Sequence, residues 1–147
     1  MIQPEKLPSI SNPILPRLQQ PVLVLSCDCS SIEAIQSALF PIPQQLICTI
    51  QHGELDSILR RDHNFRLVFI DDDNGVLPTE LMNTIQGNWP GAAIILFSND
   101  LHSWMEFIQR GAYDVLPKPV NVSDLSWVSA GALLKLDTLR KKATAGH

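Results

Sequence analysis

The sequence predicts a doubly wound α/β fold, in which helices cover both faces of a parallel five-stranded sheet. Short apolar runs of strand length alternate with segments whose apolar residues recur at three- and four-residue spacing, as on one face of a helix. This strand–helix alternation occurs five times along the chain. Such alternation favours parallel strands joined by right-handed crossovers.

Composition restricts the possible classes of protein. The chain has 147 residues, of which 45% are hydrophobic and 18% charged, as expected for one globular domain. Its net charge of −4 argues against a direct nucleic-acid surface, which needs a basic stripe. No apolar run reaches the ~20 residues that span a bilayer, and the N-terminus lacks the pattern of a signal peptide. We therefore expect a cytoplasmic protein without a membrane partner.

The chain begins with a proline-rich segment, residues 1–20, that has no hydrophobic period. We expect a flexible arm there. The alternative is an arm that packs on the domain through Ile14 and Leu15. The folded domain is expected over residues 21–134, and residues 135–147 should complete the last helix.

The first half of the domain contains two predicted strands and two predicted helices. Val22–Leu25 is an apolar run of strand length. The capping-box spacing of Ser30-x-x-Glu33 opens a helix that ends before Pro41. Leu46–Ile50 is the second strand, and residues 54–61 form a short helix.

The second half repeats the pattern with strands over Arg66–Ile70, Ala92–Phe97 and Tyr113–Leu116. A helix follows each strand. The first of these helices lies between Pro78 and Gly87, and the second is capped by Asn99 or Asp100 and ends before Gly111. Ser123 caps the third. In the last helix the apolar residues that recur at three- and four-residue spacing are Leu125, Val128, Ala132, Leu136 and Leu139.

Three polar groups follow the ends of neighbouring predicted strands. Asp71 closes the third strand, Ser98 closes the fourth, and Lys118 follows the fifth. Carboxyl ends of parallel strands line one edge of a sheet, where ligand sites form. We therefore expect an acid, a hydroxyl and an ammonium group to meet in one crevice.

Three segments together resemble the receiver domain of two-component response regulators. Gly111–Pro119 is similar to the family segment G-A-x-D-Y-L-x-K-P, Leu67–Asp71 to the strand that ends in the phosphoacceptor aspartate, and Ile94–Ser98 to the strand that ends in Thr or Ser. The resemblance covers roughly Pro21 to Leu134. It implies a flavodoxin-like three-layer (βα)5 sandwich with strand order 2-1-3-4-5.

The resemblance also implies roles for individual residues. Asp71 occupies the position phosphorylated by a histidine kinase, and Ser98 and Lys118 occupy the positions that hold the phosphoryl oxygens. In the family an acidic pair after the first strand helps the acceptor bind Mg²⁺. Such a domain belongs to a bacterial signalling protein, with residues 135–147 leading to an output domain beyond His147.

The sequence departs from the family pattern at the metal site. Ser26 and Cys27 stand where the acidic pair is expected, and Asp28 comes one position late. The loop Asp72–Gly75 and Val115, in place of the switch aromatic, are further departures. This combination resembles a degenerate receiver, or pseudo-receiver, which is not an enzyme and works through protein contacts without phosphorylation.

We accordingly expect no cofactor and no bound metal. The weak candidates for Mg²⁺ are Asp28, Asp71 and Asp73, although neighbouring strand residues point to different sides. One alternative is a working phosphoacceptor receiver that binds Mg²⁺. Another is a small α/β enzyme or nucleotide-binding module, which is disfavoured because Ser26–Ser30 lacks the glycines of a phosphate loop.

Two further expectations concern the surface and the thiols. Trp104, Trp127 and Leu134 lie on the last two predicted helices, so we expect a homodimer through the face formed by the fourth helix, the fifth strand and the last helix. The three cysteines, an odd number without an export signal, are expected to be reduced thiols: Cys27, Cys29 and Cys48.

Overall fold

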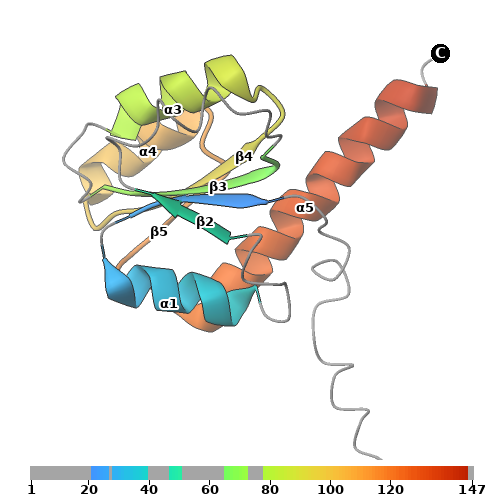
Figure 1. Cartoon of the computed structure of the whole chain (residues 1–147). Helices are drawn as coiled ribbons and strands as arrows, with labels where there is room; N and C mark the ends of the chain where they lie inside the picture. Colours follow the sequence, from blue (N-terminus) through green and yellow to red (C-terminus); the bar gives the residue numbers. More distant parts are fainter. Residues whose placement is uncertain (1–20, 27, 40–46, 51–64, 73–77, 146–147) are drawn as a thin grey trace, which may run out of the picture.

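The computed structural model describes residues 21–26, 28–39, 47–50, 65–72 and 78–145, and for residues 47–50, 101 and 136–145 it describes the backbone. The predicted arm over residues 1–20 and the predicted helix over 54–61 lie outside these ranges. The elements, shown in Figure 1, are β1 (Val22–Leu25), α1 (Cys29–Ala38), β2 (Ile47–Ile50), β3 (Leu67–Asp71), α3 (Pro78–Asn88), β4 (Ala93–Phe97), α4 (Leu101–Gln109), β5 (Asp114–Leu116) and α5 (Val122–Ala145).

The sheet confirms the predicted topology. Its five strands are parallel in the order β2-β1-β3-β4-β5. The register pairs Leu25 with Ile70, Asp71 with Phe97, and Phe97 with Leu116. The carboxyl ends of β1, β3, β4 and β5 therefore lie at one level of the sheet. The polar residues that follow these strands are aligned as a result.

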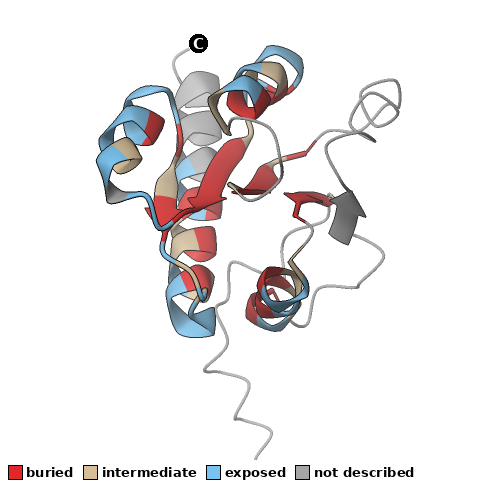
Figure 2. Ribbon diagram, turned by 90° about the vertical axis from the view of Figure 1, so that its left-hand side faces the viewer, coloured by how far each residue is buried: buried red, intermediate tan, exposed pale blue. Residues whose placement is uncertain are grey.

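Helices α1 and α5 cover one face of the sheet, and α3 and α4 cover the other (Figure 1). Successive strand residues point to opposite faces, so each strand supplies both cores. Phe69 packs in the cluster that contains α1 and α5 residues, whereas Val68 and Ile70 pack in the cluster that contains α3 and α4 residues. Figure 2 shows the consequence: β1, β3 and β4 are buried throughout, and the helices are buried on the sides that face the sheet.

Asparagine and aspartate side chains begin three of the helices. Asp28 caps α1 by accepting a hydrogen bond from the amide of Ser30 at 2.9 Å, so the predicted capping box, two residues later, was wrong. The side chain of Asn121 accepts from the amide of Asp124 at 3.0 Å and caps α5 in place of the predicted Ser123. In both helices the N-cap thus lies earlier in the chain than the serine that the sequence predicted.

The start and end of α4 agree with the prediction. Asp100 is its N-cap and accepts from the amide of His102 at 3.1 Å. Gly111 follows the helix with a φ of 111°, a left-handed conformation that favours glycine. A Cβ at this position would also collide with the side chain of Gln86, which donates to the carbonyl of Arg110.

Helix α5 is 24 residues long, and Figure 1 shows its C-terminal turns running beyond the sheet and α1. Its described buried positions include the predicted Leu125 and Ala132. The side chains of Leu136 and Leu139 lie outside the described part. No helix in the described ranges is both long and apolar enough to cross a membrane.

Candidate functional site

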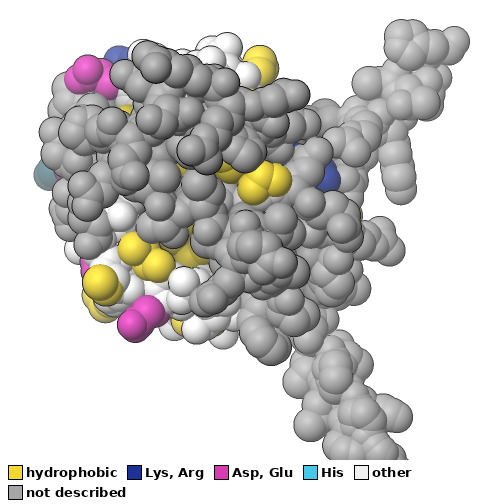
Figure 3. All heavy atoms as spheres, viewed as in Figure 1, with side chains coloured by type: hydrophobic (Ala, Val, Ile, Leu, Met, Phe, Trp, Pro, Cys, Tyr) yellow, Lys and Arg dark blue, Asp and Glu magenta, His cyan; other side chains and the backbone are white. Residues whose placement is uncertain are grey.

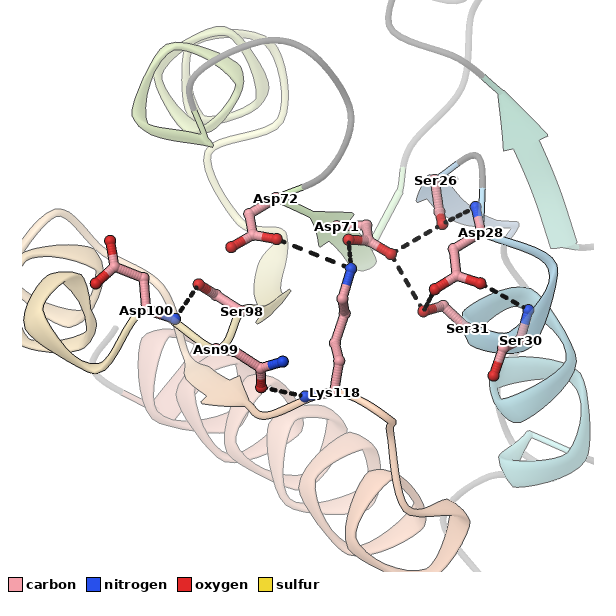
Figure 4. A network of polar contacts seen from close by, with 10 residues as sticks. All are labelled: Ser26, Asp28, Ser30, Ser31, Asp71, Asp72, Ser98, Asn99, Asp100 and Lys118. Carbon is pink, nitrogen blue, oxygen red and sulfur yellow. Dashed lines mark hydrogen bonds and ion pairs between the residues drawn. The ribbon is translucent and has the colours of Figure 1, made fainter.

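Asp71 is the centre of a polar network at the carboxyl edge of the sheet (Figure 4). It is the last residue of β3, and only 1% of its surface is exposed. Its Oδ1 accepts a hydrogen bond from Lys118 Nζ at 2.7 Å. Its Oδ2 accepts from the hydroxyl groups of Ser26 at 3.2 Å and Ser31 at 3.1 Å. Charge-assisted bonds of this kind make a buried carboxylate tolerable in the folded state.

Lys118 lies between two acids. Its Nζ is 2.7 Å from Asp71 Oδ1 and 3.9 Å from Asp72 Oδ1, and its side chain is 13% exposed. Asn99 in the loop between β4 and α4 holds it in place, because the backbone amide of Lys118 donates to Asn99 Oδ1 at 2.8 Å. The predicted meeting of acid and ammonium is therefore present in the structure, and the attraction of the two charges offsets their desolvation.

Ser26 fills the position at the end of β1 where the resemblance leads one to expect an acid. Its side chain is buried, and its Oγ donates to Asp71 and accepts from the amide of Asp28 at 3.0 Å. A neutral hydroxyl thus joins β1, the start of α1 and β3. It can satisfy the lone pairs of Asp71 but brings no negative charge to the site.

Ser31 belongs to the network, although the sequence analysis did not single it out. It is buried in the first turn of α1, and its Oγ lies 3.1 Å from Asp71 Oδ2 and 3.3 Å from Asp28 Oδ2. This hydroxyl therefore connects the two carboxylates. The only signal in the sequence was its position one turn into a helix that begins beside the carboxyl edge.

The carboxylate of Asp28 is engaged at the helix start. Its Oδ1 accepts from the amide of Ser30, and its Oδ2 lies within hydrogen-bond distance of the Ser31 hydroxyl. Capping of this kind satisfies amides that have no partner within the helix. Asp28 thus contacts Asp71 through Ser31.

Ser98 lies at the predicted edge but uses its hydroxyl elsewhere. Its side chain is fully buried, and its Oγ accepts from the amide of Asp100 at 3.1 Å, directed away from Asp71 in Figure 4. Its carbonyl accepts from Trp104 Nε1 at 3.1 Å. The structure thus brings Asp71 and Lys118 together, whereas Ser98 supports the start of α4.

The donors around Asp71 can be compared with what Mg²⁺ prefers. Mg²⁺ is a hard cation that is usually bound by one or more carboxylates together with water. Within the described residues, no group of three or more His, Cys, Asp or Glu side chains could hold a metal. The side chains that donate to the Asp71 carboxylate include two neutral hydroxyls and an ammonium group. This donor set does not fit Mg²⁺; Cys27 and the weak candidate Asp73 lie outside the described residues.

The predicted interface residues differ in exposure. Trp104 is half-buried against the core of α3 and α4. Trp127 and Leu134 on α5 are 78% and 52% exposed. Val115, in place of the switch aromatic, is buried in the core. Cys29 is a free, exposed thiol at the first residue of α1.

Solved structures with the same architecture identify the fold. A receiver domain protein (CheY-like) from Methanospirillum hungatei is 20% identical to the chain, with a TM-score of 0.67 over 81% of this chain and 97% of that one. The fold is that of a response regulator receiver domain. The likeness at this identity shows the fold alone.

Two further structures share the receiver fold. One, from Rhodopirellula baltica and described as an adenylate cyclase, is 19% identical, with a TM-score of 0.73 over 87% of this chain and 97% of that one. The other, NtrX from Brucella abortus, is 21% identical, with a TM-score of 0.70 over 87% of this chain and 30% of that one. No protein-family model matches the chain, and no curated protein matches its sequence.

Proposed function

We propose that this domain is a regulatory, non-enzymatic signalling module of the receiver type that works without a phosphorylation cycle. One observation carries the proposal: Ser26 occupies the position of a metal-binding acid and donates its hydroxyl to Asp71. The acceptor position is kept, but its surroundings hold the carboxylate as one partner of an internal network. The module then acts through protein contacts that are already formed.

The charges at the site oppose phosphotransfer to Asp71. Attack of a carboxylate on a phosphoryl group needs positive charge to stabilise the oxygens of both groups in the transition state. Lys118 is the described cation within hydrogen-bond distance of Asp71. The two serine hydroxyls bound to Oδ2 further reduce its readiness to act as a nucleophile. We infer that Asp71 forms an acyl phosphate too slowly to serve in signalling.

Mass spectrometry after incubation with acetyl phosphate and MgCl₂ tests this proposal. We expect no gain of a phosphoryl group on the intact chain, and the Asp71→Asn variant should give the same spectrum. A gain of one phosphoryl group that Asp71→Asn abolishes would contradict the proposal. That outcome would establish the other candidate, a phosphoacceptor receiver served by a histidine kinase.

Metal binding is tested separately by titration with Mg²⁺ or Mn²⁺. We expect weak binding at millimolar concentrations, because one carboxylate with hydroxyl neighbours attracts a hard dication poorly. Intrinsic fluorescence or NMR chemical shifts can follow the titration. Saturable submillimolar binding that is lost in Asp71→Asn would reject the metal-free site.

The remaining parts of the proposal concern the partners of the domain and its location in the cell. In NtrX the receiver fold occupies a part of a longer chain, and we propose that α5 likewise leads to an output domain in a cytoplasmic, bacterial signalling protein. We also propose a homodimer. A nucleic-acid partner is not proposed, since the described Lys and Arg side chains on the face in Figure 3 do not gather into a basic patch. The activity given for the Rhodopirellula baltica protein is not transferred to this chain.

A further inference from the structure

The connection between β4 and α4 is bonded at several points, and one of them is the indole of Trp104. Trp104 is half-buried on α4, and its Nε1 donates to the carbonyl of Ser98 at 3.1 Å. Ser98 is fully buried; its amide donates to the carbonyl of Leu116 at 2.9 Å, and its Oγ accepts from the amide of Asp100 at 3.1 Å. The indole is therefore the bond that ties the backbone of Ser98 to the body of α4.

Asn99 carries the same connection on to Lys118. The Oδ1 of Asn99 accepts from the backbone amide of Lys118 at 2.8 Å, and Lys118 Nζ donates to Asp71 Oδ1 at 2.7 Å (Figure 4). The carbonyl that Trp104 bonds belongs to the planar peptide group that joins Ser98 to Asn99. The indole thus restricts the orientation of Asn99, and Asn99 in turn restricts the backbone of Lys118.

Lys118 has a second carboxylate close by. Its Nζ lies 3.9 Å from Asp72 Oδ1, and the side chain of Asp72 is 23% exposed, whereas that of Asp71 is 1% exposed. The two acids define an inner position of the ammonium group, on Asp71, and an outer position, on Asp72. Leaving the buried carboxylate is costly, although two serine hydroxyls remain bound to its Oδ2. The outer position is therefore a minor state whose population rises when the restraints on Lys118 weaken.

We propose that Trp104 is a latch that holds Lys118 on Asp71. When the indole leaves the carbonyl of Ser98, the side chain of Asn99 loses its fixed orientation, and the ammonium group moves to its outer position. The position of α4 and the state of the ion pair are then linked, because α4 carries the indole. Such linkage is reciprocal, so loss of the ion pair must also loosen the indole. This inference rests on the proposed function, in which the buried carboxylate belongs to an internal network, and names the residue that regulates it.

The rate of amine acylation, measured on the whole chain by mass spectrometry, tests the latch. The amine of Lys118 is 13% exposed and bonded to a carboxylate, so it should react slowly, and the exposed Lys135 serves as the internal reference. Trp104→Phe keeps an aromatic ring on α4 but removes the N–H donor. We expect this substitution to raise the rate at Lys118, relative to Lys135, by about fivefold, as for the loss of one hydrogen bond.

Trp89→Phe is the matched control. Trp89 is buried in the core cluster against which Trp104 packs, but it precedes the amino end of β4, whereas the latch lies at the carboxyl end. The same substitution there weakens the core alone, and the rate at Lys118 should stay within about twofold of the wild type.

Asn99→Ala tests the middle link of the path. It should raise the rate at Lys118 as Trp104→Phe does, and the double variant should add no further increase, because both substitutions act on one path. Circular dichroism confirms that each variant is folded.

Fluorescence tests the reverse direction. Trp104 becomes the only tryptophan of the chain after Trp89→Phe and Trp127→Phe. Its emission maximum should shift to the red on Lys118→Met, because loss of the ion pair loosens the indole. An unchanged acylation rate in Trp104→Phe or Asn99→Ala, an equal rise in Trp89→Phe, or an emission maximum that Lys118→Met leaves in place would each overturn the latch. None of these outcomes depends on whether the site accepts a phosphoryl group, so the latch and the proposed function can fail independently.

Discussion

The ammonium group of Lys118 lies 2.7 Å from the buried Oδ1 of Asp71, although 47 residues separate them in the chain. The pair joins the end of β3 to the loop before α5. On the other side of Asp71, Ser26 and Ser31 attach the same carboxylate to β1 and α1. The site thus connects four segments of the domain through one side chain.

This pair should contribute strongly to stability. We expect Lys118→Met to lower the free energy of unfolding by about 3 kcal/mol, because it leaves the charge of Asp71 buried without its cation. The double variant Asp71→Asn/Lys118→Met should lose less than Lys118→Met alone, since no uncompensated charge remains. Urea unfolding of the three proteins measures the difference. A Lys118→Met variant within about 0.5 kcal/mol of the wild type would show that the pair is not stabilising.

Replacing the serine at the end of β1 should create the missing metal site. Ser26→Asp places a second carboxylate beside Asp71, so the variant should be less stable without metal and should gain thermal stability when Mg²⁺ is added. We expect at least about a tenfold rise in Mg²⁺ affinity, measured by the dependence of the melting temperature on MgCl₂ concentration.

Ser30→Asp is the matched control for that experiment. It adds the same charge to the same segment, but Ser30 is exposed, and its amide donates to Asp28 at the start of α1. Its melting temperature should respond to Mg²⁺ as that of the wild type does. An equal response of Ser26→Asp and Ser30→Asp would contradict the assignment of Ser26 to the metal position.

Two serines on α5 should respond in opposite ways to truncation. The Ser129 hydroxyl is fully buried and has no hydrogen-bond partner in the described part of the chain, so Ser129→Ala should stabilise the domain by about 1 kcal/mol. The Ser126 hydroxyl donates to the carbonyl of Ala38, and Ser126→Ala should destabilise by a similar amount. Chemical denaturation gives both values, and a destabilised Ser129→Ala would mean that its hydroxyl has a partner in solution.

The caps of α1 and α4 form another pair for comparison. Asp28→Ala and Asp100→Ala each remove a carboxylate that accepts from the second amide of a helix and from a serine hydroxyl. Each should cost about 1 kcal/mol, within the range of N-cap substitutions. Hydrogen exchange should localise each loss to the first turn of the affected helix. Unchanged protection there would contradict the capping role.

The sequence determined the sheet and the meeting of Asp71 with Lys118. Continuous apolar runs such as Leu67–Ile70 are stable only when both faces are covered, and the alternation with helices leaves a parallel sheet as the natural arrangement. Parallel strands then align their carboxyl ends, so residues at those ends come together whatever the loops do.

Tertiary structure alone decided how the polar side chains are used. The Ser98 hydroxyl accepts from the amide of Asp100 and does not take part in the Asp71 network. Ser31 reaches Asp71 because Asp28 caps α1 and the helix begins at Cys29. Trp104 and Trp127 look equivalent in sequence, yet one donates to the carbonyl of Ser98 and the other faces solvent. Such choices depend on hydrogen bonds that differ by about 1 kcal/mol, which sequence patterns do not resolve, whereas the burial of whole strands involves much larger free energies.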